Sequence, residues 1–162
     1  MKFNAAAVLA ALAAVASAAP AAQSPTAPAP QNSTTPAPQT PNPGYVHILG
    51  SIDDCYESTF VNQGSGASPL VSDCQIITKN IAGGGTWTIG KGPTQLVQFG
   101  TCAFNAGSES GWSKIGNSDI IDLINGSIQK FQRDGKVGSK GRMTCQNVGL
   151  GVNWVNWGLY HT

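Results

Sequence analysis

The four cysteines of this 162-residue chain constrain its fold more than any other feature. They are Cys55, Cys74, Cys102 and Cys145, and no two of them have the close spacing typical of a zinc site. Because their number is even and an export signal precedes them, we predict two disulfides, each stabilising the fold by about 2 to 4 kcal/mol. Four cysteines allow three pairings. We favour Cys55 with Cys145, tethering an N-terminal loop to a C-terminal strand, and Cys74 with Cys102, tying a helix to the sheet.

The N-terminal part of the chain is typical of an exported protein. Residues 1–18 combine an early lysine, an uncharged run and a small-residue ending, which predicts a secretory signal peptide. Residues 19–43 hold eight of the ten prolines and no apolar pattern, which predicts a disordered linker rich in Pro, Ala and Thr. Residues 44–162 would then form one secreted, extracellular domain. Sequons make Asn32 and Asn125 candidate glycosylation sites.

Helical periodicity is clearest between residues 117 and 131. Apolar residues at positions 120, 121, 124, 128 and 131 form one stripe, as in an amphipathic helix. Asn117 or Ser118 is suited to cap its start and Gly135 to end it. A first helix is predicted over Ser68–Ile81, with Pro69 at its first helical position.

Five segments have the composition of strands. The second and third are joined by a Gly-Lys-Gly-Pro turn, which predicts a hairpin between them. The five segments are Tyr45–Ile48, Thr86–Ile89, Gln95–Phe104, Arg142–Gln146 and Asn153–Tyr160. Interleaved with two helices, they predict an α+β fold in which both helices pack on one face of an antiparallel sheet.

Charge and titratable residues argue against a catalytic or nucleic-acid-binding protein. The chain has nine Lys and Arg and eight Asp and Glu, so it has no strong electrostatic field that would attract nucleic acid. The histidines are His47 and His161, and the second lies too close to the chain end for a triad. Asp53, Asp54 and Glu57 could bind calcium or act as a glycosidase pair, but a solvated loop is favoured. We therefore expect no catalytic residue, cofactor or metal.

The candidate binding residues are basic and aromatic. A glycine-rich loop over residues 136–142 carries Lys136, Lys140 and Arg142, which we predict to form the binding surface unless they are simply solvated. Trp154 and Trp157 are three apart, so on a strand they face opposite sides and only one can join the core. The other is expected to fill an edge of the core, with sugar stacking as the alternative.

Several short motifs, taken in order and spacing, resemble the necrosis-inducing factor family of fungal secreted effectors. They are Ser68-Pro69, Asp73 to Ile77, Asn80-Ile81, Trp87, Gly100 to Phe104, Ile115 to Asn117, Asp119 to Asp122, Gly135 to Gly141, Met143, Cys145 and Val155 to Trp157. The resemblance implies action outside the fungus, on a host or a competitor, that promotes infection or plant cell death. The layout is also similar to virus-encoded killer toxins of smut fungi, which implies an α/β sandwich and, by analogy, calcium-channel block.

Together these observations predict a secreted, non-enzymatic effector, monomeric and disulfide-bonded, that promotes virulence or plant necrosis by binding. Its partner would be a host or competitor protein, a membrane channel or a wall polysaccharide, and not nucleic acid. The alternatives are a carbohydrate-binding module of the cell wall and a toxin that blocks an ion channel.

Overall fold

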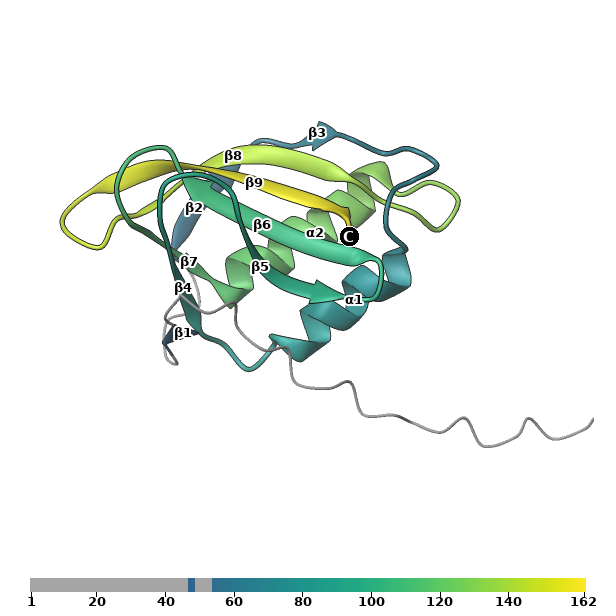
Figure 1. Ribbon diagram of the computed structural model, residues 1–162, viewed down its shortest axis with the longest axis horizontal. Helices are drawn as coiled ribbons and strands as arrows, with labels where there is room; N and C mark the ends of the chain where they lie inside the picture. Colours follow the sequence, from purple (N-terminus) through teal and green to yellow (C-terminus); the bar gives the residue numbers. More distant parts are fainter. Residues whose placement is uncertain (1–46, 49–53) are drawn as a thin grey trace, which may run out of the picture. The chain divides into compact units, whose positions relative to one another are not determined.

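A computed structural model describes residues 47–48 and 54–162 (Figure 1). The predicted signal peptide, the linker, Asn32 and Asp53 lie outside the described residues. Within them the chain forms two helices, α1 (Val71–Asn80) and α2 (Asn117–Phe131). The strands are β1 (His47–Ile48), β2 (Cys55–Ser58), β3 (Val61–Asn62), β4 (Thr86–Ile89), β5 (Thr94–Phe99), β6 (Cys102–Ser108), β7 (Ser113–Gly116), β8 (Ser139–Gln146) and β9 (Val152–His161).

The strands form two antiparallel sheets. The larger sheet has six strands in the order β2-β8-β9-β6-β5, with β3 also paired to β8, and the smaller has the order β1-β4-β7. The α+β class is confirmed, whereas the expectation of a single sheet is wrong. The predicted hairpin between Thr86–Ile89 and Gln95–Phe104 is also wrong, because β4 pairs with β7 and β5 pairs with β6.

Both helices pack on one face of the larger sheet, and no helix among the described residues covers the other face (Figure 1). Strand residues alternate between these faces, so every second side chain of β8 and β9 enters the core. The core is built from large apolar side chains that are almost fully buried: Ile77, Ile89, Phe104, Ile115, Ile120, Ile124, Met143, Val155 and Leu159. The predicted packing of both helices on one side of a sheet is confirmed.

The disulfides have the pairing that we favoured. Cys55 and Cys145 face each other in the ladder between β2 and β8, and Cys74 of α1 is bonded to Cys102 at the start of β6. The first bond closes a segment of 90 residues and the second one of 28. Each bond therefore joins a short or peripheral element to the central strands.

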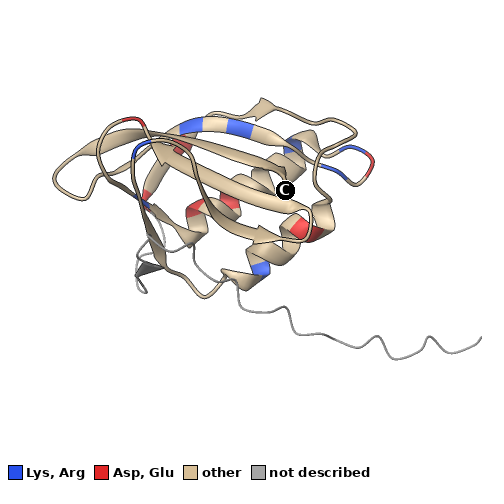
Figure 2. Ribbon diagram, in the orientation of Figure 1, with Lys and Arg blue, Asp and Glu red and all other residues tan. Residues whose placement is uncertain are grey.

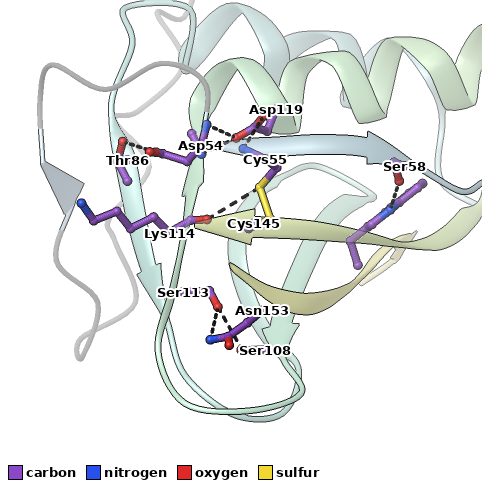
Figure 3. The surroundings of a disulfide bond; sticks show 12 residues. Asp54, Cys55, Ser58, Thr86, Ser108, Ser113, Lys114, Asp119, Cys145 and Asn153 are labelled. Carbon is purple, nitrogen blue, oxygen red and sulfur yellow. Dashed lines mark hydrogen bonds between the residues drawn. A yellow bond between two sulfur atoms is a disulfide. The ribbon is translucent and has the colours of Figure 1, made fainter. Parts of the chain in front are cut away.

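Asp119, in the first turn of α2, anchors the beginning of β2 (Figure 3). Its carboxylate accepts hydrogen bonds from the backbone N–H groups of Gly116 at 2.7 Å, Asp54 at 3.0 Å and Cys55 at 3.3 Å. Asp54 is buried as well and accepts a hydrogen bond from the Thr86 hydroxyl at 2.8 Å. This network connects the start of β2 to β4 of the smaller sheet and to α2.

The predicted caps of the second helix differ from the observed ones. The N-cap is Gly116, because Asn117 is drawn into the core. The Asn117 side chain accepts a hydrogen bond from the Trp87 indole at 2.8 Å and donates to the backbone oxygens of Ile81 and Gly84. Asn117 therefore ties the end of α1 to β4 instead of capping α2.

Gly135 does not end the second helix, which stops at Phe131. Asp134 and Gly135 have φ angles of 52° and 73°, as in a type I′ turn. The flanking residues Arg133 and Lys136 exchange backbone hydrogen bonds of 2.9 Å in both directions. The Asp-Gly pair thus forms a two-residue hairpin turn that redirects the chain toward β8.

Two other predicted boundaries are wrong. The first helix starts at Val71, since Ser68 and Pro69 are buried in the turn that precedes it. The predicted strand over 95–104 is broken at Gly100, which has a φ of 52°. The Asp73 carboxylate accepts hydrogen bonds from the Thr101 N–H at 2.8 Å and hydroxyl at 2.7 Å, and this fixes the turn between β5 and β6.

Candidate functional site

The uncovered face of the six-stranded sheet, called here the outer face, carries a row of polar and aromatic side chains. Lys140 and Arg142 lie on it from β8, which shows as the blue bands on that strand in Figure 2. Trp154 and Asn156 lie on it from β9, where Arg142 pairs in register with Asn156. All four side chains are exposed, because successive residues of a strand point to opposite faces and the residues between these four point into the core.

Arg142 is the centre of the best-defined cluster on this face. Its guanidinium carbon lies 4.0 Å from the centroid of the Trp154 ring, a cation–π contact. Its Nη2 atom lies 2.6 Å from Oε2 of Glu109, while Asn156 donates to the other carboxylate oxygen at 3.1 Å. Glu109 in turn donates its backbone N–H to the Trp154 carbonyl at 2.8 Å. The four side chains therefore hold one another in place although solvent reaches them.

The pKa of the Glu109 carboxyl is lowered from its ordinary value, chiefly by the hydrogen bond from Arg142 and further by the one from Asn156. The carboxylate is therefore ionised at neutral and mildly acidic pH. Since Arg142 and Glu109 offset each other, the cluster offers hydrogen-bonding groups and an aromatic ring with little net charge.

The other end of β9 contributes a second aromatic residue to the outer face. The Tyr160 hydroxyl donates to Oε1 of Gln95 at 2.7 Å, and Nε2 of Gln95 donates to Oε1 of Gln98 at 2.7 Å. Burial raises the pKa of Tyr160, so it remains a neutral phenol. Trp154 and Tyr160 are six residues apart on one strand, so the row is about 20 Å long.

The structure divides the predicted basic loop. Residues 139–146 form β8, so the predicted loop ends before Ser139, and Lys140 and Arg142 stand on the outer face. Lys136 lies elsewhere, beside the Asp-Gly turn, where its ammonium group donates to the backbone oxygen of Gly66. The three cations named from the sequence therefore do not form one cluster. Lys140 and Arg142 remain together on the candidate surface.

The two C-terminal tryptophans face opposite sides of the sheet, as predicted. Trp157 is 3% exposed, packs edge-on to Phe60 with ring centroids 5.2 Å apart, and donates its indole N–H to the Ser58 hydroxyl at 2.7 Å. Trp154 is 47% exposed, so the expectation that it fills an edge of the core is wrong.

The residues considered for catalysis do not assemble. Asp54 is buried in the network around Asp119, whereas Glu57 on β2 is exposed. His161 is exposed and its Nδ1 lies 2.6 Å from the terminal carbonyl oxygen, while the His47 side chain lies outside the described part of the chain. Among the described residues, no group of three His, Cys, Asp or Glu side chains is placed to hold a metal ion.

Sequence reasoning missed Glu109, Asn156 and Tyr160. The alternation of residues 152–160 could have placed Asn156 and Tyr160 on the face of Trp154, since all three are even-numbered positions of one strand. Glu109 had no such signal, because it follows β6 in a loop and meets Arg142 only through strand pairing.

Comparison with known proteins identifies the family of this chain. A family model, Hce2, described as "Pathogen effector; putative necrosis-inducing factor", matches residues 54–145, which include all four cysteines and both helices. This chain belongs to the Hce2 family. The resemblance to necrosis-inducing effectors is therefore confirmed. Strand β9, with Trp154, follows the matched range.

Two relatives of this Hce2 chain come from Penicillium expansum. It is 36% identical over 118 residues to "Probable chitinase LysM18", covering 69% of this chain and 8% of the relative. It is 31% identical over 111 residues to "Secreted chitinase LysM12", covering 64% of this chain and 7% of the relative. The chain thus spans less than a tenth of the length of the curated relatives that it matches. In the part of this Hce2 protein that the structure describes, no helix is both long and apolar enough to cross a bilayer.

Proposed function

We propose that this chain is a secreted effector that acts by binding an extracellular polysaccharide, without catalysis, through the outer face of its larger sheet. Plant cell necrosis or virulence would follow from that binding. A non-enzymatic role is consistent with the scattered carboxylates and histidines described above.

The observation that carries the proposal is the half-exposed Trp154 ring, one face of which the Arg142 guanidinium covers, with Glu109 and Asn156 fixed around it. The C–H faces of pyranose rings pack on aromatic rings, and their hydroxyl groups need fixed donors and acceptors around that ring. Arg142 and Glu109 are held at 2.6 Å before any ligand arrives, so they need little ordering on binding. A preordered cluster in which Arg142 and Glu109 offset each other suits a neutral polymer better than an acidic protein.

The relatives support a wall polysaccharide as the first ligand to test. Both carry the words chitinase and LysM in their names, and one is named as secreted. Because the shared segment is a small part of each relative, we propose that it contributes polysaccharide binding and that the hydrolytic site lies elsewhere in those proteins. Chitin is therefore the first probe and cellulose the comparison.

A pull-down of the purified protein on insoluble chitin and cellulose tests this proposal. We expect Trp154→Ala to weaken polysaccharide binding by about tenfold or more, as for an aromatic residue at the centre of an interface. Trp112→Ala is the matched control, since Trp112 is 57% exposed, against 47% for Trp154, but lies outside the outer-face cluster. Binding that is absent, or equally strong in both variants, would refute the outer face as the site.

Two further readouts concern the effect and the absence of catalysis. Infiltration of the oxidised protein into leaves should cause necrosis, whereas reduced and alkylated protein should not. Incubation with chitin or its oligosaccharides should release no new sugar fragments. Fragment release by the purified chain would contradict a purely binding role.

A further inference from the structure

The loop between β8 and β9 presents an apolar surface that the proposed function does not use. Two aliphatic residues of the loop are exposed, with Val148 at 55% and Leu150 at 100%, and so is Val152, the first residue of β9, at 50%. Trp112, from the loop after β6, is 57% exposed. These four residues are called here the apolar tip. Soluble proteins seldom leave several large apolar side chains exposed together unless they contact a partner or a membrane.

The four residues belong to one surface because the two loops are hydrogen-bonded to each other. The Val148 N–H donates to the Trp112 carbonyl at 3.1 Å, and the Asn153 side chain donates to the same oxygen at 3.3 Å. Trp112, Val148 and Asn153 also line one shallow hollow at this end of the sheet. The β8–β9 loop extends past the sheet at the left of Figure 1, away from both helices.

Hydrogen bonds of Asn147 close the base of the β8–β9 loop. The Asn147 N–H donates to the Gly151 carbonyl at 3.0 Å, and the Asn147 side chain donates to the Leu150 carbonyl at 3.0 Å. Gly151 permits this tight closure with a φ of 108°. This closure orders the loop, and its remaining peptide groups can stay hydrated at the headgroup level while the apolar side chains point further in.

The charges around the tip also favour a lipid surface. No Asp, Glu, Lys or Arg follows Arg142 in the chain, so the loop itself is uncharged. Trp112 packs over Gly90, next to the exposed Lys91. The nearby acid Glu109 is already paired with Arg142. Exposed aliphatic side chains, an indole that packs on Gly90 and the cation that follows Gly90 are the groups that the acyl, interfacial and headgroup levels of a bilayer with anionic lipids attract.

We propose that the apolar tip inserts into the headgroup and upper acyl region of a lipid bilayer and docks the folded domain on the membrane surface. Val148, Leu150 and Val152 would enter the acyl boundary, and Trp112 would lie at the interface. A protruding loop with a fully exposed leucine at its point suits a deformable lipid surface better than a preformed protein pocket. This proposal is independent of polysaccharide binding, which uses the neighbouring outer face.

Flotation of the full secreted chain with vesicles tests the insertion. The vesicles are phosphatidylcholine alone and phosphatidylcholine mixed with phosphatidylserine, and we expect binding to be stronger with the anionic mixture. Leu150→Asp should lower the partition coefficient about tenfold or more, as expected when the burial of one leucine side chain is lost. Leu70→Asp is the matched control, because it makes the same change at another exposed leucine far from the tip in sequence, and it should bind as the unaltered protein does.

A second measurement locates the inserted side chain. Lipids brominated near the headgroup should quench tryptophan fluorescence of the unaltered protein and of Trp154→Phe, but much less in Trp112→Phe. An unchanged near-ultraviolet circular dichroism spectrum of Leu150→Asp would show that the domain is folded and that only the membrane contact is lost.

Three results would overturn the proposal. The first is no vesicle binding by the unaltered protein. The second is equal binding of Leu150→Asp and Leu70→Asp, which would mean that cations alone attract the protein. The third is undiminished quenching by brominated lipids in Trp112→Phe, which would mean that Trp112 does not lie at the interface.

Discussion

Replacing Asp119 by alanine should destabilise this domain more than any surface substitution. The Asp119 side chain belongs to a residue that is only 8% exposed, and it accepts three backbone hydrogen bonds, two of them from the start of β2. Asp119→Ala would leave the N–H groups of Asp54, Cys55 and Gly116 without this acceptor in a site that water reaches poorly. The start of β2 would then be held less firmly in the larger sheet.

The magnitude follows from the number and kind of these bonds. A hydrogen bond to a charged group contributes roughly 1.5 to 3 kcal/mol, and a buried donor left unpaired costs roughly 1 to 3 kcal/mol. Because the three donors share one carboxylate, their contributions are not additive, and we expect a total loss of about 3 to 5 kcal/mol. For a domain of this size that corresponds to a fall in Tm of roughly 12 to 20 °C.

Thermal and urea unfolding, followed by near-ultraviolet circular dichroism with the disulfides intact, would measure this loss. Asp122→Ala is the matched control, since Asp122 is one turn further along the same helix and exposed. It should change the free energy of unfolding by about 0.5 kcal/mol or less. Asp119→Asn keeps one acceptor oxygen and should fall between the two. A difference below about 1 kcal/mol in the free energy of unfolding between the two alanine variants would refute this reasoning. Water or another acceptor would then have to replace the Asp119 carboxylate.

Three further predictions concern other parts of the molecule. Removing the Cys55–Cys145 disulfide, which closes a segment of 90 residues, should cost about 4.6 kcal/mol by the chain-entropy relation, against about 3.6 kcal/mol for the disulfide that closes 28 residues. Urea unfolding of the two double-alanine variants checks this order, and the reverse order would contradict it. The lowered pKa of Glu109 means that its ion pair is intact above the ordinary carboxyl pKa of 4.5 and is lost as the pH falls through the lowered value, and Arg142→Gln should raise the midpoint of a carbon NMR titration toward 4.5. Asn125 is exposed on α2, so protein from a eukaryotic host should carry a glycan there, seen as a mass shift that Asn125→Gln abolishes without a change in Tm.

Local features of this protein could be predicted from its sequence. The apolar stripe of α2 needs only the 3.6-residue period, and the opposite orientation of Trp154 and Trp157 needs only the two-residue period of a strand. The formation of two disulfides was predicted from the even number of cysteines, whereas their pairing was a preference among three possibilities that the structure decided. The helix stripe and the two tryptophan orientations depend on residues within a few positions of one another, so for them the sequence alone was sufficient.

The tertiary structure decided the sheets and the candidate surface. Whether β4 pairs with β5 or with β7 depends on the competition between a short turn and a distant strand, and no local pattern ranks the two. Glu109 meets Arg142 across 33 residues because β6 and β8 both pair with β9. Trp154 is exposed because neither helix covers its face of the sheet. Long-range strand register and helix placement fix which side chains share a surface, and those are properties of the whole folded chain.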